Sequence, residues 1–178
     1  MINFINQANL SRKINKADLF KFIVKLAQDT ASHNAPHWGL FLIVGNFALV
    51  SYKLEQYIQL TTNDLDGHYV AYGSKAFKDI FIENCKKNID GAFILDTASG
   101  QLLGNRVLYL DLKSEISEER GARHHASASA SLDSNIEFII TVSEETLNVR
   151  LYNDGKVESS EEVGVQQLGL ESIAEDTL

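Results

Sequence analysis

The spacing of apolar residues predicts two amphipathic helices in the first half of the chain. The first begins at Asp18, whose side chain is placed to cap it, and ends before Pro36, because the residue that precedes a proline is pushed away from helical angles. Its apolar residues recur at intervals of three and four positions, at Leu19, Phe22, Ile23 and Leu26. The second helix is capped by Ser74 and has an apolar face, which places Cys85 in the core beside Phe77, Ile80 and Phe81.

Apolar runs bounded by turn residues predict the strands. Residues 39–44 are apolar throughout, which is typical of a central strand, and we expect them to form a hairpin with residues 47–52 around a Gly45-Asn46 turn. Further strands are predicted at 92–95, 107–110, 136–142 and 147–152, with a turn at 97–105, a helix of small residues at 123–131 and polar, turn-rich chain at 56–72. This order predicts a single α/β or α+β domain in which a twisted mixed sheet is flanked by helices.

We expect three parts in the chain, with no convincing linker between them. Residues 1–36 form an N-terminal helical segment, and residues 37–157 hold the predicted sheet. After the turn at Asn153-Asp154-Gly155 the chain becomes acidic, and we expect residues 158–178 to be a solvated or frayed tail. The total length of 178 residues suits one domain.

Charge and cysteine content exclude several classes of protein. Aspartate and glutamate number 24 against 16 lysines and arginines, and the formal net charge of −8 disfavours nonspecific binding of nucleic acid. The single cysteine excludes an intrachain disulfide and a thiolate zinc cage. The longest apolar stretch, residues 39–50, is shorter than the roughly 20 residues that span a bilayer, and residues 1–9 lack the pattern of a signal peptide. We therefore expect a cytoplasmic protein with no nucleic-acid and no membrane partner.

Three polar clusters could carry chemistry. Asp90-Gly91-Ala92 places a carboxylate beside two small residues at the start of a strand, where it can reach a ligand hydroxyl or a metal ion, although the same tripeptide suits a simple turn. Residues 121–127 open a helix, so free N–H groups and Arg123 suit a phosphate chain, and an exposed basic helix start explains the pattern equally well. Ser143-Glu144-Glu145 lies in a tight turn, where a hydroxyl and a carboxylate can face either a ligand or solvent.

The order and separation of these clusters, Asp-Gly-Ala, Arg-His and Ser-Glu-Glu, resembles the diadenylate cyclase family. This family is the nucleotide-binding domain found at the N-terminus of the DNA-integrity scanning protein. The likeness runs from about residue 37 to residue 155 and includes Tyr109-Leu110-Asp111-Leu112 before the Arg-His motif. It implies that two ATP molecules, one in each of two facing domains, are joined into cyclic di-AMP with release of two pyrophosphates. It further implies a divalent metal, Mg²⁺ or Mn²⁺, as cofactor, and a homodimer or higher homo-oligomer.

The resemblance also implies a role for each motif residue. Asp90 would help to activate the ribose 3′-hydroxyl and would hold the metal together with Glu144, while Arg123 and His124 match the phosphate-binding motif. Asp90, Arg123 and His124 are thus the implied catalytic residues. The implied nucleotide contacts are Gly91, Ala92, Leu110 beside the adenine, Gly121, Ala122, His125, Ser143 and Glu144.

Two positions depart from the family pattern, which reads Gly-Thr-Arg-His-Arg where this chain has Ala122 and His125. A hydroxyl and a fixed positive charge are therefore missing. In a subclass variant, Arg120, Arg106 or the metal would compensate for the missing charge. Alternatives stay open at this point. The chain is a cyclase for which the two changes can mean reduced activity, or a catalytically weak or inactive module that senses ATP or a cyclic dinucleotide through the same pocket. The third alternative is a purely structural domain that has kept the motifs by descent.

Overall fold

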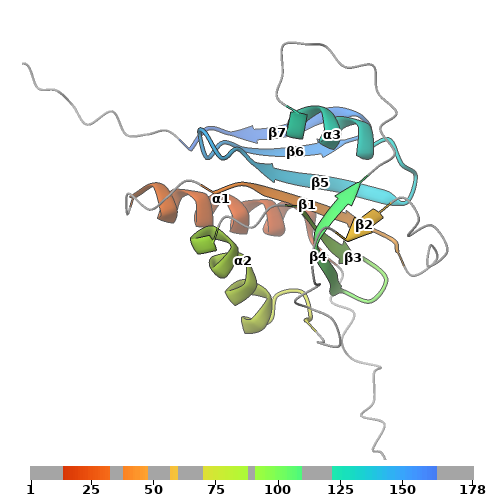
Figure 1. Ribbon diagram of the computed structural model, residues 1–178, viewed down its shortest axis with the longest axis horizontal. Coiled ribbons are helices and arrows are strands. Elements are labelled where there is room, and N and C mark those ends of the chain that lie inside the picture. Colours follow the sequence, from red (N-terminus) through yellow and green to blue (C-terminus); the bar gives the residue numbers. More distant parts are fainter. Residues whose placement is uncertain are drawn as a thin grey trace, which may run out of the picture.

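The computed structural model describes residues 14–32, 38–47, 57–59, 70–87, 91–109 and 122–163. The elements in these ranges are α1 (Lys16–Ser32), β1 (Leu40–Gly45), β2 (Tyr57–Gln59), α2 (Lys75–Lys87), β3 (Ala92–Asp96), β4 (Gln101–Tyr109), α3 (Ala122–Ala130), β5 (Ile136–Val142), β6 (Val149–Asn153) and β7 (Lys156–Glu161). The strands form one mixed sheet in the order β2-β4-β3-β1-β5-β6-β7 (Figure 1). The predicted single α+β domain, with helices on a mixed sheet, is confirmed.

Strand β1 lies in the middle of the sheet, as its apolar sequence predicts, but the predicted hairpin is wrong. It pairs in parallel with β3 on one side and antiparallel with β5 on the other, so both of its edges are taken. Residues 48–52 lie outside the described part of the chain. The Gly45 carbonyl accepts the Thr97 N–H at 2.8 Å, and the Asn46 N–H donates to the Asn135 carbonyl at 2.8 Å. Gly45 serves this close approach, because a Cβ atom there would collide with the Asn135 carbonyl oxygen.

The two predicted helices form, with one change at their caps. Asn15 caps α1 in place of Asp18, because the Asn15 side-chain oxygen accepts the Asp18 N–H at 3.1 Å and Asp18 is already the third helical residue. The Ser74 cap of α2 is confirmed, since its hydroxyl oxygen accepts the Phe77 N–H at 3.1 Å. The side chain of Cys85 lies outside the described part of the structure. No helix in the described ranges is both long and apolar enough to cross a membrane.

Helices α1 and α2 cover one face of the sheet, and α3 covers the other (Figure 1). The larger core lies under α1 and α2, where Leu19 and Ile23 pack in one cluster with Phe77, Phe81 and Leu42. The smaller core lies under α3. Because α1 contributes buried residues to the main core, the predicted N-terminal helical segment is part of the folded domain.

Two boundaries around the sheet differ from the prediction. Strand β4 already begins at Gln101, so only residues 97–100 form the turn that was expected to reach residue 105. Strand β6 begins at Val149, because Leu147 has a positive φ of 57° and lies in the preceding turn.

The edges of the sheet come from segments that the sequence pattern assigned to loop or tail. Within the polar stretch 56–72, strand β2 pairs antiparallel with β4. The acidic tail does not begin at residue 158, because β7 pairs antiparallel with β6 through residue 161. Every side chain of β7 is exposed, so its sequence carries no apolar signal. An ion pair of 2.6 Å joins Lys16 of α1 to Glu158 of β7.

Candidate functional site

The strand register brings two of the three polar clusters to the same end of the sheet. Phe93 of β3 lies opposite Leu42 of β1, which lies opposite Ile140 of β5. From this level β3 extends back only one residue to its start at Ala92, and β5 extends only two residues forward to its end at Val142. The Asp-Gly-Ala cluster precedes β3 and the Ser-Glu-Glu cluster follows β5, so both lie where these strands begin or end.

The third cluster opens α3, and the first cluster lies on the same face of the sheet. Ala92 belongs to the small core on this face, together with Ile43, Ile139 and Tyr152 from the strands and Ala130 from α3. The methyl group of Ala92 is only 1% exposed, so it packs in this core. Gly91 before it has a positive φ of 97°, a conformation that strongly favours glycine. This pair therefore leads the chain into β3 on the α3 face, and a direct nucleotide contact at either residue stays a prediction.

A pocket of about 640 Å³ opens at this end of the sheet. It is lined by His124 from the first turns of α3, residues 141–146 from the end of β5 and the following turn, and Asn148, Arg150 and Tyr152. Three of the predicted site residues, His124, Ser143 and Glu144, meet in it. The pocket is mostly polar in its chemistry, with hydroxyl, carboxylate, guanidinium and imidazole groups around one cavity.

His124 is held in the pocket by a buried tyrosine. The Tyr152 hydroxyl lies 2.5 Å from Nδ1 of His124, and the two rings meet edge to face with centroids 5.2 Å apart. Tyr152 is 1% exposed, whereas His124 is half-buried. The contact at Nδ1 thus fixes the orientation of the imidazole ring at the pocket.

The turn between β5 and β6 presents Ser143 and Glu144. The Ser143 carbonyl accepts the Leu147 N–H at 2.8 Å, and the Ser143 N–H donates to the Asn148 carbonyl at 3.0 Å. The Ser143 hydroxyl oxygen accepts the Thr146 N–H at 3.4 Å, a long bond that leaves the hydroxyl proton able to donate elsewhere. Backbone hydrogen bonds thus fix the turn, while the exposed Glu144 and Glu145 carboxylates lie at the pocket.

Sequence reasoning missed Arg150 and Tyr152 as members of the pocket. They alternate with Val149 and Leu151, which are buried in the core on the opposite face. An arginine at a polar position of an alternating strand is ordinarily solvent-facing, so the pattern alone gave no reason to single it out. Only the strand pairing, which sets Arg150 opposite Thr141 of β5, places it at the site.

Several predicted residues cannot be placed in the pocket. Asp90, Leu110 and Gly121 lie outside the described residues, and for Ala122 and Arg123 the structure describes the helical backbone without the side chains. His125 is described but does not line the pocket. Its Nε2 atom is enclosed and has no hydrogen-bond partner within the described part of the chain.

The chemistry of the pocket fits a hard divalent cation. Carboxylates at Glu144 and Glu145 and the hydroxyl of Ser143 are oxygen ligands of the kind that Mg²⁺ and Mn²⁺ prefer. No group of three or more metal-ligating side chains occurs among the described residues. A magnesium ion commonly needs only one or two carboxylates when substrate phosphates supply the rest, so this donor set suits a metal that arrives with a nucleotide.

Among the described residues, the one buried carboxylate with a shifted pKa lies at the opposite end of the sheet. Burial of Asp96 opposes its ionisation, but hydrogen bonds outweigh burial and hold its pKa below the ordinary value of 3.8. The donors include the Ser99 hydroxyl and N–H, and the Phe47 N–H at 2.9 Å. Asp96 thus stays charged to tie the end of β3 to the segment after β1, a structural role.

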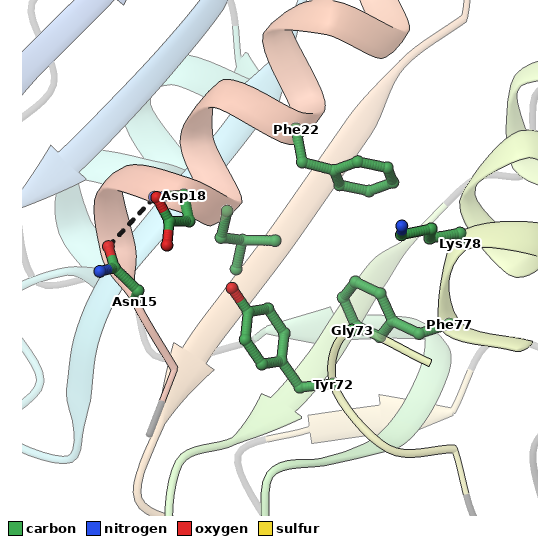
Figure 2. Close-up of a pocket in the computed structure, with 8 residues that line it drawn as sticks. Asn15, Asp18, Phe22, Tyr72, Gly73, Phe77 and Lys78 are labelled. Carbon is green, nitrogen blue, oxygen red and sulfur yellow. Dashed lines mark hydrogen bonds between the residues drawn. The ribbon is translucent and has the colours of Figure 1, made fainter. Parts of the chain in front are cut away.

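A second pocket, of about 610 Å³, lies on the other face of the sheet between α1 and α2. Figure 2 shows Asn15 and Asp18 on one side of it and the rings of Phe22, Tyr72 and Phe77 toward the other. None of the predicted site residues lines it. The polar clusters of the sequence therefore point to the pocket on the α3 face.

Comparison with protein families matches residues 40–157 to the DAC family, described as the DisA bacterial checkpoint controller nucleotide-binding domain. Among solved structures, the chain is similar to a double mutant of DacA from Staphylococcus aureus, with a TM-score of 0.52 and 23% identity over 83% of this chain and 89% of that one. It is also similar to a hypothetical membrane spanning protein from Bacillus cereus, with a TM-score of 0.52 and 23% identity over 77% of this chain and 60% of that one. At this identity the likeness to solved structures shows the fold. A comparison with curated proteins gives no match.

Proposed function

The chain belongs to the DAC family of nucleotide-binding domains, the diadenylate cyclase family, and we propose that it condenses two ATP molecules into cyclic di-AMP and two pyrophosphates. One observation carries the proposal. His124 from α3 and the Ser143-Glu144 pair from the β5–β6 turn line one polar pocket, at the end of the sheet where β3 begins. In the sequence, Asp90 lies two residues before Ala92, the first residue of that strand.

The proposed reaction is a displacement at phosphorus. The ribose 3′-oxygen of one ATP attacks the α-phosphorus of the other, the bond from that phosphorus to pyrophosphate breaks, and the hydroxyl proton passes to a base. The family motif assigns the activation of the hydroxyl to Asp90. The same step with the two nucleotides exchanged closes the ring, so that two ATP give one cyclic di-AMP, two pyrophosphates and two protons.

The pocket residues would stabilise the charge that moves during this step. His124 lines the pocket and its imidazole would meet one phosphate oxygen, and the Ser143 hydroxyl can donate to another. A divalent ion held by Asp90 and Glu144 would neutralise negative charge on the departing pyrophosphate.

The proposal requires two copies of the chain. Each ATP in its own pocket must meet a second ATP, which a two-fold arrangement of facing pockets provides. We therefore infer a catalytic homodimer, and we expect specific activity to fall on dilution toward the dimer dissociation constant. Activity that stays constant in samples shown by light scattering to be monomeric would contradict the dimer.

The test of the activity is direct. Purified protein is incubated with ATP and either Mg²⁺ or Mn²⁺, and products are separated by chromatography with mass detection. Cyclic di-AMP is expected from the wild type and from Asp79→Asn, which changes an exposed aspartate on α2 remote from the pocket, and not from Asp90→Asn. Absence of product from the wild type at every protein concentration and with both metals would refute the cyclase.

A second candidate function is favoured by one observation. His125, at a position where the family pattern carries a charged residue, does not line the pocket and has its Nε2 enclosed without a partner in the described part of the chain. A site that lacks this charge could bind ATP or a cyclic dinucleotide without turning it over. ATP-dependent thermal stabilisation with no product would support this sensor module, and His125→Arg would then test whether the missing charge is the cause.

A further inference from the structure

Arg150 is the one described residue of the pocket with a permanent positive charge, and neither the motifs nor the family match assigns it a role. Thr141 of β5 lies directly opposite it in the strand ladder, and both side chains line the pocket that holds His124, Ser143 and Glu144. Because the alternate residues Val149 and Leu151 are buried in the core under α1 and α2, the strand fixes Arg150 on the α3 face.

Arg150 is a half-buried residue, and its charge is not paired with a carboxylate of any residue that the structure describes. It forms no hydrogen bond or ion pair with any residue that the structure describes, although Glu144 and Glu145 line the same pocket. The four ion pairs found in the described ranges all use lysine, on the exposed surface of helices or of β7. Partial removal of a cation from water without pairing is unfavourable, so a half-buried and unpaired arginine at an open pocket is poised for an anion.

We propose that Arg150 binds the phosphate chain of the nucleotide. The inference rests on the proposed function in that it takes ATP as the ligand of this pocket. Arginine suits a phosphate because its planar guanidinium can donate two parallel hydrogen bonds, and the hydroxyls of Thr141 and Ser143 lie in the same wall. In a chain of net charge −8 such local cations must hold the polyphosphate against the overall field. Arg150, on β6, would thereby supply the fixed positive charge that the pocket does not receive from His125 on α3.

The experiment measures binding separately from turnover. Dissociation constants of the full chain for ATP, AMP and adenosine are determined by calorimetry in the presence of Mg²⁺, for the wild type, Arg150→Gln and Arg150→Lys, with ATP supplied as 3′-deoxy-ATP, which lacks the attacking hydroxyl and cannot be turned over. Lys156→Gln serves as the control, because it removes an exposed cation from β7 outside the pocket. Circular dichroism and thermal unfolding of each variant establish that it is folded.

Arg150→Gln is expected to weaken ATP binding about ten- to hundredfold, the effect of losing a charge-assisted hydrogen bond, and to leave adenosine binding unchanged. In Arg150→Gln the affinity for AMP should fall less than the affinity for ATP. Arg150→Lys should bind ATP with intermediate affinity, and Lys156→Gln should bind it as tightly as the wild type. Equal loss of ATP and adenosine affinity, or unchanged ATP affinity in folded Arg150→Gln, would overturn the inference, as would a wild type that binds no ATP.

The outcome is distinguishable from failure of the proposed function. A wild type that binds ATP through Arg150 but forms no cyclic di-AMP would refute the cyclase and support the role of Arg150. Cyclic di-AMP produced by Arg150→Gln with the KM of the wild type would support the cyclase and overturn the role of Arg150.

Discussion

Removing one hydroxyl group from Tyr152 tests how the site is held together. Tyr152→Phe keeps the ring, which is 1% exposed and packs with Ile43, Ala92 and Ile139, and deletes only the oxygen that lies 2.5 Å from Nδ1 of His124. The substitution therefore separates the hydrogen bond from the packing. If the hydroxyl donates to Nδ1, the proton of a neutral His124 ring is on Nε2.

The expected loss of stability is small and can be bounded. An ordinary hydrogen bond contributes about 0.5–1.5 kcal/mol, and a buried group left unsatisfied costs about 1–3 kcal/mol. His124 is half-buried and lines the pocket, so we expect a cost near 1 kcal/mol, where the two ranges overlap. In a protein of 178 residues this lowers the unfolding midpoint by about 2–4 °C.

The effect on the imidazole is the decisive measurement. In ¹⁵N-labelled protein, long-range ¹H–¹⁵N spectra report which ring nitrogen of His124 carries the proton, and we expect Tyr152→Phe to shift the Nδ1 resonance and mix the tautomers. If the bond also holds His124 for catalysis, a loss of about 1 kcal/mol lowers kcat about fivefold while KM changes little. Tyr72→Phe, which removes a hydroxyl at the pocket on the other face, should leave the His124 resonances in place. Unchanged His124 resonances and midpoint in Tyr152→Phe would refute the assigned contact.

Two further predictions concern the corner that fixes β1. Asp96→Asn should lose about 2–3 kcal/mol of stability at pH 7, because a carboxylate that accepts hydrogen bonds from Ser99 and Phe47 becomes a neutral amide. The folded pKa of Asp96 lies below its ordinary value of 3.8, so the stability that its carboxylate contributes is complete above that value and is lost as pH falls through the folded pKa. The unfolding free energies of wild type and variant should therefore converge in strong acid. A difference between them that stays constant with pH would contradict the assignment. Gly45→Ala should cost about 1–3 kcal/mol in urea unfolding, because its methyl group must displace the Asn135 backbone, and a loss clearly below this range would show that the corner adjusts freely.

The sequence pattern located most helices and strands because burial on one face leaves a periodic signal. It could not choose the neighbours of β1, since a strand buried on both faces is apolar throughout and carries no information on which strands flank it. Gly45-Asn46 reads as a hairpin turn, yet the glycine serves close contact with Asn135. Strand β7 was assigned to a tail for the opposite reason, because all its side chains are exposed.

The sequence predicted only those residues of the candidate site that belong to short motifs. His124, Ser143 and Glu144 stand out as local clusters and meet in the pocket. Arg150 and Tyr152 do not, since single residues in an alternating strand become site members only through the pairing of β5 with β6. Their function depends on contacts between residues far apart in the sequence, and no local pattern records those contacts.

The geometry of the site depends on the far end of the sheet. A slip of one residue between β1 and its neighbours would turn every side chain of the strand to the other face and shift the start of β3 against the Ser143 turn. At the Gly45 corner, backbone bonds to Thr97 and Asn135 fix β1 against β3 and β5 together, and Asp96 holds the segment that follows. These bonds at one end of the strands thus add to the ladders that set the register, while two of the three polar clusters lie at the other end. A substitution at this corner should therefore weaken ligand binding even though it touches no pocket residue.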